Sequence, residues 1–156
     1  MKFTKIIITA LLMVFALNAN AQKVKMKKGF VYVDKVKFLK VEKINGSKYF
    51  FSTLDDVEFL SVTLEKFGTG KHMSVRNPVP GQDTEIYHYY SVFKFLDIEG
   101  IEESFEVDEG SIKELIRMMH KSKIVDDGGE LSIKNLTRMK EKYSDNVSER
   151  RFLTKN

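Results

Sequence analysis

Apolar and polar positions follow three different patterns along the chain. Residues 6–17 are almost continuously apolar, and residues 29–107 show short runs rich in Val, Phe, Tyr and Thr between turn residues. From Asp108 onward, apolar side chains recur at helical spacing. Closely spaced β-prone runs are typical of strands joined by hairpins, and a 3.6-residue period is typical of amphipathic helices. The pattern therefore predicts strands first and helices afterwards.

Turn residues divide the β-prone region into about seven strands, mostly antiparallel. Asn45-Gly46 favours a two-residue type I′ hairpin turn, because both residues readily take positive φ angles. Asp34-Lys35 and Asp55-Asp56 lie at equivalent places between other apolar runs and predict further turns. The glycines of segment 67–70 predict one more reversal, after which residues 71–76 would pair back as a short strand.

The longest β-prone run, residues 85–98, has apolar side chains on both faces. A sheet that is open to water on one side usually alternates apolar with polar residues, so this strand is predicted to lie centrally with cover on both sides. Curling of the sheet would provide the second cover. We therefore expect a curled or partly closed sheet.

Two helices are predicted after the strands. Ser111 and Glu114 have the spacing of a capping box at the start of the first helix, segment 126–129 ends it, and Ser132 can cap the second. Each helix gathers its apolar residues on one face, which would cover the sheet. These residues are Ile112, Leu115, Ile116 and Met119 in the first helix and Ile133, Leu136, Met139 and Tyr143 in the second.

The combined pattern predicts an α+β fold: an antiparallel β-meander of about seven strands, curled or partly closed, with two C-terminal helices packed on it. We expect a single domain over residues 29–143. A basic N-terminal arm would precede it at residues 22–28, and a polar tail that frays would follow at residues 144–156.

The first 21 residues have the three parts of a secretory signal peptide. Lys2 and Lys5 form a cationic start, residues 6–17 form an apolar centre, and Ala19-Asn20-Ala21 provides small residues before a cleavage point after Ala21. The apolar run is too short to span a bilayer, which takes about 20 residues. We therefore expect a soluble exported protein, periplasmic or secreted, with no transmembrane segment after the signal peptide is removed.

Composition narrows the class of protein further. The chain has 26 basic and 22 acidic side chains, and removal of Lys2 and Lys5 with the signal peptide lowers the net charge from +4 to +2. Lys and Glu are interspersed along most segments, which argues against a nucleic-acid partner. Cysteine is absent, so the exported fold depends on its hydrophobic core and has no disulfide.

Catalytic and metal-binding motifs are missing from the sequence. His72, His88 and His120 are not spaced as a metal pair, no Gly-x-Ser-x-Gly motif is present, and no cofactor or metal is expected. His88 is interpreted as a packed, hydrogen-bonded histidine and His120 as an ordinary residue of a helix surface. The acidic pairs, including Asp126-Asp127, are explained as turn formers without a calcium ion.

Two groups of residues remain as candidate binding surfaces. Tyr87, His88, Tyr89 and Tyr90 could line a groove for a carbohydrate or an apolar ligand, although core packing is the simpler interpretation of aromatic residues on a long strand. The second group could touch anionic lipid head groups or polyanions, or could form a charged edge strand that discourages aggregation, which we favour. It consists of Lys23, Lys25, Lys27 and Lys28.

The leading hypothesis is a non-enzymatic binding or interaction module of the bacterial envelope or secreted fraction. Its partner would be another envelope protein or a small ligand. The alternative is a small exported hydrolase whose site is assembled in the tertiary structure, with His72 or His88 as its base. A third hypothesis is attachment to an anionic surface through the lysines of residues 22–28.

Overall fold

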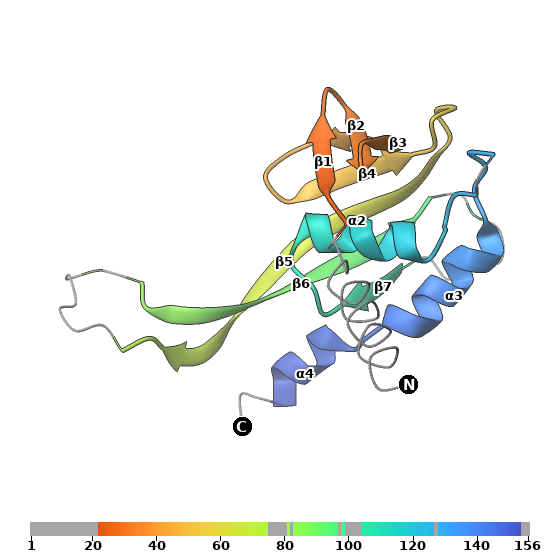
Figure 1. The fold of residues 1–156 in the computed structure, drawn as a ribbon. Helices are drawn as coiled ribbons and strands as arrows, with labels where there is room; N and C mark the ends of the chain where they lie inside the picture. Colours follow the sequence, from red (N-terminus) through yellow and green to blue (C-terminus); the bar gives the residue numbers. More distant parts are fainter. Residues whose placement is uncertain are drawn as a thin grey trace, which may run out of the picture.

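Seven antiparallel strands and three helices make up the part of the chain that the computed structural model describes, which is residues 22–74, 81, 83–96, 98, 104–126 and 128–153 (Figure 1). Each strand pairs with the next along the chain, and the sheet is not closed into a barrel. This arrangement confirms the predicted α+β meander. The elements are β1 (Val24–Lys27), β2 (Phe30–Val33), β3 (Val36–Lys43), β4 (Lys48–Ser52), β5 (Glu58–His72), β6 (Glu85–Phe95), β7 (Ser104–Val107), α2 (Ile112–Lys121), α3 (Ile133–Tyr143) and α4 (Val147–Leu153).

One face of the sheet, called here the inner face, holds the hydrophobic core. Successive side chains of a strand point to opposite sides, so each strand contributes alternate residues to this face. Helix α2 runs across the inner face (Figure 1), and its Leu115, Ile116 and Met119 are fully buried there. Leu136 and Met139 of α3 complete the cover. The strand residues of the core include Val24, Val31, Val33, Leu39, Tyr49, Phe51, Leu60, Val62, Phe93, Phe95, Phe105 and Val107.

Helix α4 packs against the opposite side of the sheet, the outer face, at its β7 end. Glu106 alternates with the buried Phe105 along β7, and its carboxylate accepts a 2.7 Å hydrogen bond from the backbone N–H of Ser148. Val147 is only 1% exposed. The prediction that residues 144–156 form a frayed tail is therefore wrong for the described part of this segment, because a buried valine and a partly buried hydrogen bond hold it on the sheet.

The β3–β4 hairpin lies where Asn45-Gly46 predicted it, but its turn is of another kind. Neither residue has a positive φ angle, so the type I′ prediction is wrong. Asn45 Oδ1 instead accepts hydrogen bonds from the backbone N–H groups of Ser47 and Lys48, at 2.9 and 2.8 Å. A side chain that mimics a backbone turn in this way removes the need for positive φ. Consecutive positive φ angles of 50° and 74° occur at the predicted turn Asp34-Lys35.

Strand β5 continues through Gly68 and Gly70, so the predicted reversal and the separate strand at residues 71–76 are wrong for the residues described. The register against β6 shifts between Gly68 and His72, and Gly70 has a φ of 72°, which marks a local irregularity within one strand. A Cβ on Gly68 would lie 2.0 Å from Glu85 Oε1. Gly68 thus leaves room for the Glu85 side chain.

The first half of β6 extends beyond the core. Phe93 and Phe95 are buried, whereas Ile86 is 41% and Tyr89 is 54% exposed. Figure 1 shows the reason: the long β5–β6 hairpin projects from the body of the protein, past the helices. The start of this strand therefore lacks the burial on both sides that was predicted for residues 85–98.

The lysine-rich segment at residues 22–28 is part of the domain. Lys27 pairs with Phe30, and Val24 of β1 is buried in the core. The expectation of a separate arm before residue 29 is thus wrong. Because β1 lies at one end of the strand order, its lysines occupy an edge strand, as the favoured interpretation of this segment held.

Helices α2 and α3 start where predicted but lack the predicted side-chain caps. Ser111 and Ser132 occupy the N-cap positions in extended conformation, and neither side chain makes a capping hydrogen bond. Glu114 forms an ion pair with Arg117 one turn further along. The capping-box prediction is therefore wrong, because the Glu114 carboxylate binds a guanidinium group instead of the backbone N–H of Ser111.

The predicted signal peptide, Met1 to Ala21, lies outside the described residues. Of the helices described, none has both the length and the apolar character needed to span a bilayer.

Neighbouring phenylalanines on β4 test the assignment of the two faces. Phe51 is fully buried and Phe50 points to the outer face. We expect Phe51→Ala to lower the free energy of unfolding by about 3–5 kcal/mol, because it leaves a cavity in the core. Phe50→Ala should cost less than half as much. Urea denaturation measures both values, and equal costs would contradict the assignment.

Candidate functional site

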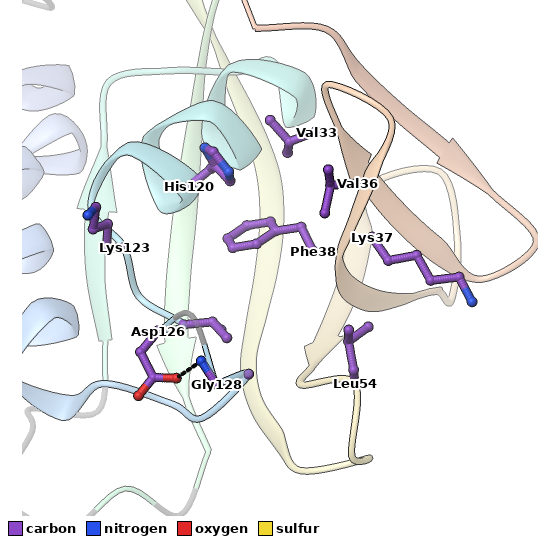
Figure 2. Close-up of a pocket in the computed structure, with 11 residues that line it drawn as sticks. Val33, Val36, Lys37, Phe38, Leu54, His120, Lys123, Asp126 and Gly128 are labelled. Carbon is purple, nitrogen blue, oxygen red and sulfur yellow. Dashed lines mark hydrogen bonds between the residues drawn. The ribbon is translucent and has the colours of Figure 1, made fainter.

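A pocket of about 470 Å³ lies between the sheet and the connection from α2 to α3 (Figure 2). We call it the α2–β3 pocket. Its walls come from the start of β3, the turns on either side of the β3–β4 hairpin, the end of α2 and the loop that follows α2. The lining residues are Val33, Val36, Lys37, Phe38, Leu54, His120, Lys123, Val125, Asp126, Gly128 and Gly129.

A bulge in β3 turns Phe38 into this pocket. Val31 pairs with Leu39 and Tyr32 pairs with Lys37, so Phe38 is an extra residue without a partner on β2. Such a residue bends the strand and redirects its side chain. Figure 2 shows the Phe38 ring pointing from β3 toward α2. There it meets His120 edge to face, with 4.9 Å between the ring centroids.

His120 is held in place by the chain that leads into β1. The side-chain amide nitrogen of Gln22 lies 2.9 Å from His120 Nδ1, within hydrogen-bonding distance. Arg117 Nε donates to the backbone carbonyl of Gln22 at 2.8 Å. The interpretation of His120 as an ordinary surface residue is therefore wrong, because the ring packs between Gln22 and Phe38.

The loop at the far side of the pocket is shaped by Asp126. Its Oδ1 accepts hydrogen bonds from the backbone N–H groups of Gly128 and Glu130, at 2.9 and 3.0 Å. Gly129 has a φ of 87°, which a side chain would oppose. This carboxylate oxygen is thus used in forming the turn, as the sequence predicted for the helix connection.

Apolar side chains dominate the α2–β3 pocket. Val33, Val36, Phe38, Leu54 and Val125 supply its aliphatic and aromatic surface. Polar and charged residues complete the lining, namely Lys37, His120, Lys123 and Asp126 together with the glycine loop. Concave apolar sites of about 300–1,000 Å³ with a few polar groups are typical of binding sites for small molecules. The geometry therefore suits a small ligand with an apolar body.

The structure does not bring the four predicted site residues of β6 together. Strand alternation puts Tyr87 and Tyr89 on the inner face and His88 and Tyr90 on the outer face. Tyr89 lies against Gly110, where a Cβ would come within 2.4 Å of the tyrosine Cβ. Their role in ligand binding stays a prediction, for two separate surfaces rather than one groove.

Tyr87 has polar partners on the projecting hairpin. Its hydroxyl donates to Asp83 Oδ2 at 2.7 Å, and Lys66 Nζ lies 4.0 Å from the centre of its ring. The hydrogen bond to Asp83 raises the pKa of Tyr87 above its ordinary value of 10.0. The same bond, helped by the backbone N–H of Glu85, lowers the pKa of Asp83 below 3.8.

On the outer face, His88 is linked by polar contacts to Asp108, Arg150 and Asp145. We call these four residues the His88 cluster. His88 Nε2 lies 2.7 Å from Asp108 Oδ1, and Arg150 donates to Asp108 Oδ2 at 3.0 Å and to Asp145 Oδ2 at 2.8 Å. The Phe67 ring lies 5.2 Å from the imidazole. His88 thus has a polar partner, as expected, but its side chain is 38% exposed.

A second cleft, also of about 470 Å³, adjoins this cluster. Its lining includes Thr69, whose hydroxyl donates to the backbone carbonyl of Ile86 at 2.7 Å. The other predicted base, His72, is exposed on the hairpin with Nδ1 3.1 Å from Thr84 Oγ1. Both predicted bases thus have a polar partner. His88 has the carboxylate of Asp108 and His72 has the hydroxyl of Thr84, so the two histidines belong to different sites.

Within the described ranges, no three His, Asp or Glu side chains gather closely enough to hold a metal ion. The four lysines of the N-terminal segment lie along the sheet edge: Lys25 and Lys27 within β1, Lys23 just before it, and Lys28 in the turn to β2. Lys28 has a φ of 52°. A role for these lysines in surface binding stays a prediction.

Sequence reasoning missed the α2–β3 pocket. One signal was present: the adjacent apolar pair Phe38-Leu39 breaks the alternation of residues 36–43 and indicates a bulge. No local pattern indicated that His120 would face it, because that contact joins β3 to a helix far along the chain.

Comparison with known proteins does not add to this geometry: no protein-family model, no curated protein and no solved structure matches the chain.

Removal of the Asp83 carboxylate tests the polar contact on the hairpin. In Asp83→Asn the acceptor loses its negative charge, so the pKa of Tyr87 should fall toward its ordinary value. Absorbance of tyrosinate during alkaline titration measures the change. Tyr87→Phe identifies which step of the titration belongs to Tyr87. An unchanged pKa in Asp83→Asn would contradict the contact.

Proposed function

We propose that this protein is a small exported binding module, without enzymatic activity, that holds a small ligand with an apolar body in the α2–β3 pocket. The observation that supports the proposal is the apolar lining of the pocket around Phe38, a residue that a strand bulge directs away from ordinary pairing. Its rigid surroundings fit binding: the sheet forms one wall, and hydrogen bonds within the Asp126 turn hold the other.

Export is part of the same proposal. It rests on the signal-peptide pattern of Met1 to Ala21. We expect the exported protein to be periplasmic or secreted. A pocket for a small ligand then fits a protein of the bacterial envelope or the secreted fraction that binds without reacting.

A bulky residue at the mouth of the pocket tests this function. Val36 lines the pocket and is 70% exposed, so Val36→Trp can fill the space without disturbing the core. The probe is N-phenyl-1-naphthylamine, an uncharged dye whose fluorescence rises in apolar surroundings. We expect the wild-type protein to bind the dye and Val36→Trp to bind it at least about tenfold more weakly, because the ring occupies the site.

Ile44→Trp is the matched control, since Ile44 is 53% exposed at the β3–β4 turn and does not line the pocket. It should bind the dye as the wild type does. Loss of binding in both variants, or in neither, would exclude the pocket as the binding site of the dye.

A second candidate function, hydrolysis, is favoured by one contact. His88 lies 2.7 Å from Asp108 beside a cleft, and a carboxylate that orients an imidazole is one part of many hydrolytic sites. Two contacts weaken this candidate. Asp108 also binds Arg150, and the hydroxyl of Thr69 donates to a backbone carbonyl instead of facing the imidazole.

Turnover of p-nitrophenyl esters separates the two functions. A binding module should hydrolyse these esters no faster than free imidazole at the same concentration does. His88→Ala should leave the rate unchanged. A loss of about 100-fold or more in His88→Ala would support the hydrolase instead, since general-base catalysis contributes at least about that factor.

A further inference from the structure

The outer face of β1–β4 combines lysines with aromatic side chains. Strand register aligns them in two rows, with Lys25, Tyr32 and Lys37 in one row and Lys27, Phe30 and Lys40 in the other. In each row an aromatic residue thus lies between two lysines. Lys48 and Phe50 of β4 continue the same face. We call these eight residues the lysine face.

This face is open to solvent and strongly cationic. Lys25, Lys27 and Lys37 are exposed, and Lys40 and Lys48 are half-buried. Glu42 lies on the same side beside Phe50, and Asp56 pairs with Lys40 from the neighbouring turn. Five lysines against these two acids leave an excess of positive charge on this face.

The cations form a two-dimensional array. Neighbouring strands lie about 4.8 Å apart, so the backbone positions of the two lysines of a row, separated by one strand, are about 10 Å apart. The rows themselves follow one another along the strands. An arrangement of this kind matches a plane of anionic groups. A single extended anionic chain would be matched better by lysines that follow one line.

Two of the three aromatic rings, those of Phe30 and Phe50, have an ammonium group over them. Lys37 Nζ lies 4.2 Å from the centre of the Phe30 ring, and Lys48 Nζ lies 5.1 Å from that of Phe50. Proteins that bind single-stranded nucleic acids stack bases on open aromatic faces. Lysine also lacks the planar fork with which arginine reads guanine. These contacts argue against a nucleic acid and for a surface of phosphate head groups.

We propose that the lysine face binds the surface of a bilayer that contains anionic phospholipids. The lysines supply attraction to the head groups, each worth about a fivefold gain in affinity near the surface. Phe30, Tyr32 and Phe50 lie between them at the depth of the polar head groups, where aromatic side chains are favoured. The α2–β3 pocket borders this face, because Lys37 of the lysine face is also one of its lining residues.

Vesicle sedimentation tests this proposal. All described strands and helices lie within residues 22–153, so the test uses residues 22–156, with circular dichroism to verify folding. Vesicles of phosphatidylglycerol and phosphatidylcholine should bind the protein, and pure phosphatidylcholine should not. Binding should weaken between about 0.05 and about 0.3 M NaCl because salt screens exposed charges. Lys25→Gln/Lys27→Gln should lower the affinity about 20-fold.

Lys113→Gln/Lys134→Gln is the matched control, because it removes the same charge from exposed lysines of α2 and α3 on the other side of the sheet. Its affinity should stay within about twofold of the wild type. Equal losses in both double variants would overturn the proposal, since net charge alone would explain the binding. Tighter binding to an oligothymidylate than to anionic vesicles, with the same dependence on Lys25 and Lys27, would overturn it in favour of a nucleic acid.

Discussion

Burial of the inner face of an open sheet beneath α2 and α3 is the constraint on which the other features of this protein depend. Side chains of all seven strands meet Leu115, Ile116 and Met119 there, and the chain has no disulfide to replace them. Because successive side chains of a strand point to opposite faces, the residues between the buried positions lie on the outer face. The lysines of β1 and the histidine of β6 lie on the outer face for this reason.

The α2–β3 pocket lies where that cover ends. Helix α2 finishes at Lys121, and the Asp126 turn leads the chain away to α3 without filling the space above β3. Phe38 reaches into the space because the β3 bulge leaves it unpaired. A pocket at the edge of a packed core combines apolar walls with access from solvent, as binding requires. On the outer side of the same strands, lysines and aromatic rings face the solvent, and Lys37 belongs to both this face and the lining of the pocket.

Much of the architecture could be predicted because it depends on local patterns. The β-prone runs, the helical spacing after Asp108 and the starts of α2 and α3 all follow from neighbouring residues. The errors lie where a distant group competes with a local one. Glu114 binds Arg117 instead of capping the helix. Gly68 makes room for the Glu85 side chain instead of forming a turn. Helix α4 is held by Glu106 of β7. The number of strands was right, although β1 replaced the strand expected after Gly70.

The sequence by itself determined the class of the fold, the meander order, the two faces of each strand and the lysine-rich edge, because turn preference and side-chain alternation act over a few residues. Only the tertiary structure decided that Gln22 would hold His120 beside Phe38, or that Asp108 would join His88 to Arg150. These contacts join residues far apart in the chain. Their formation depends on how the whole sheet twists and where the helices lie on it, which no local pattern specifies.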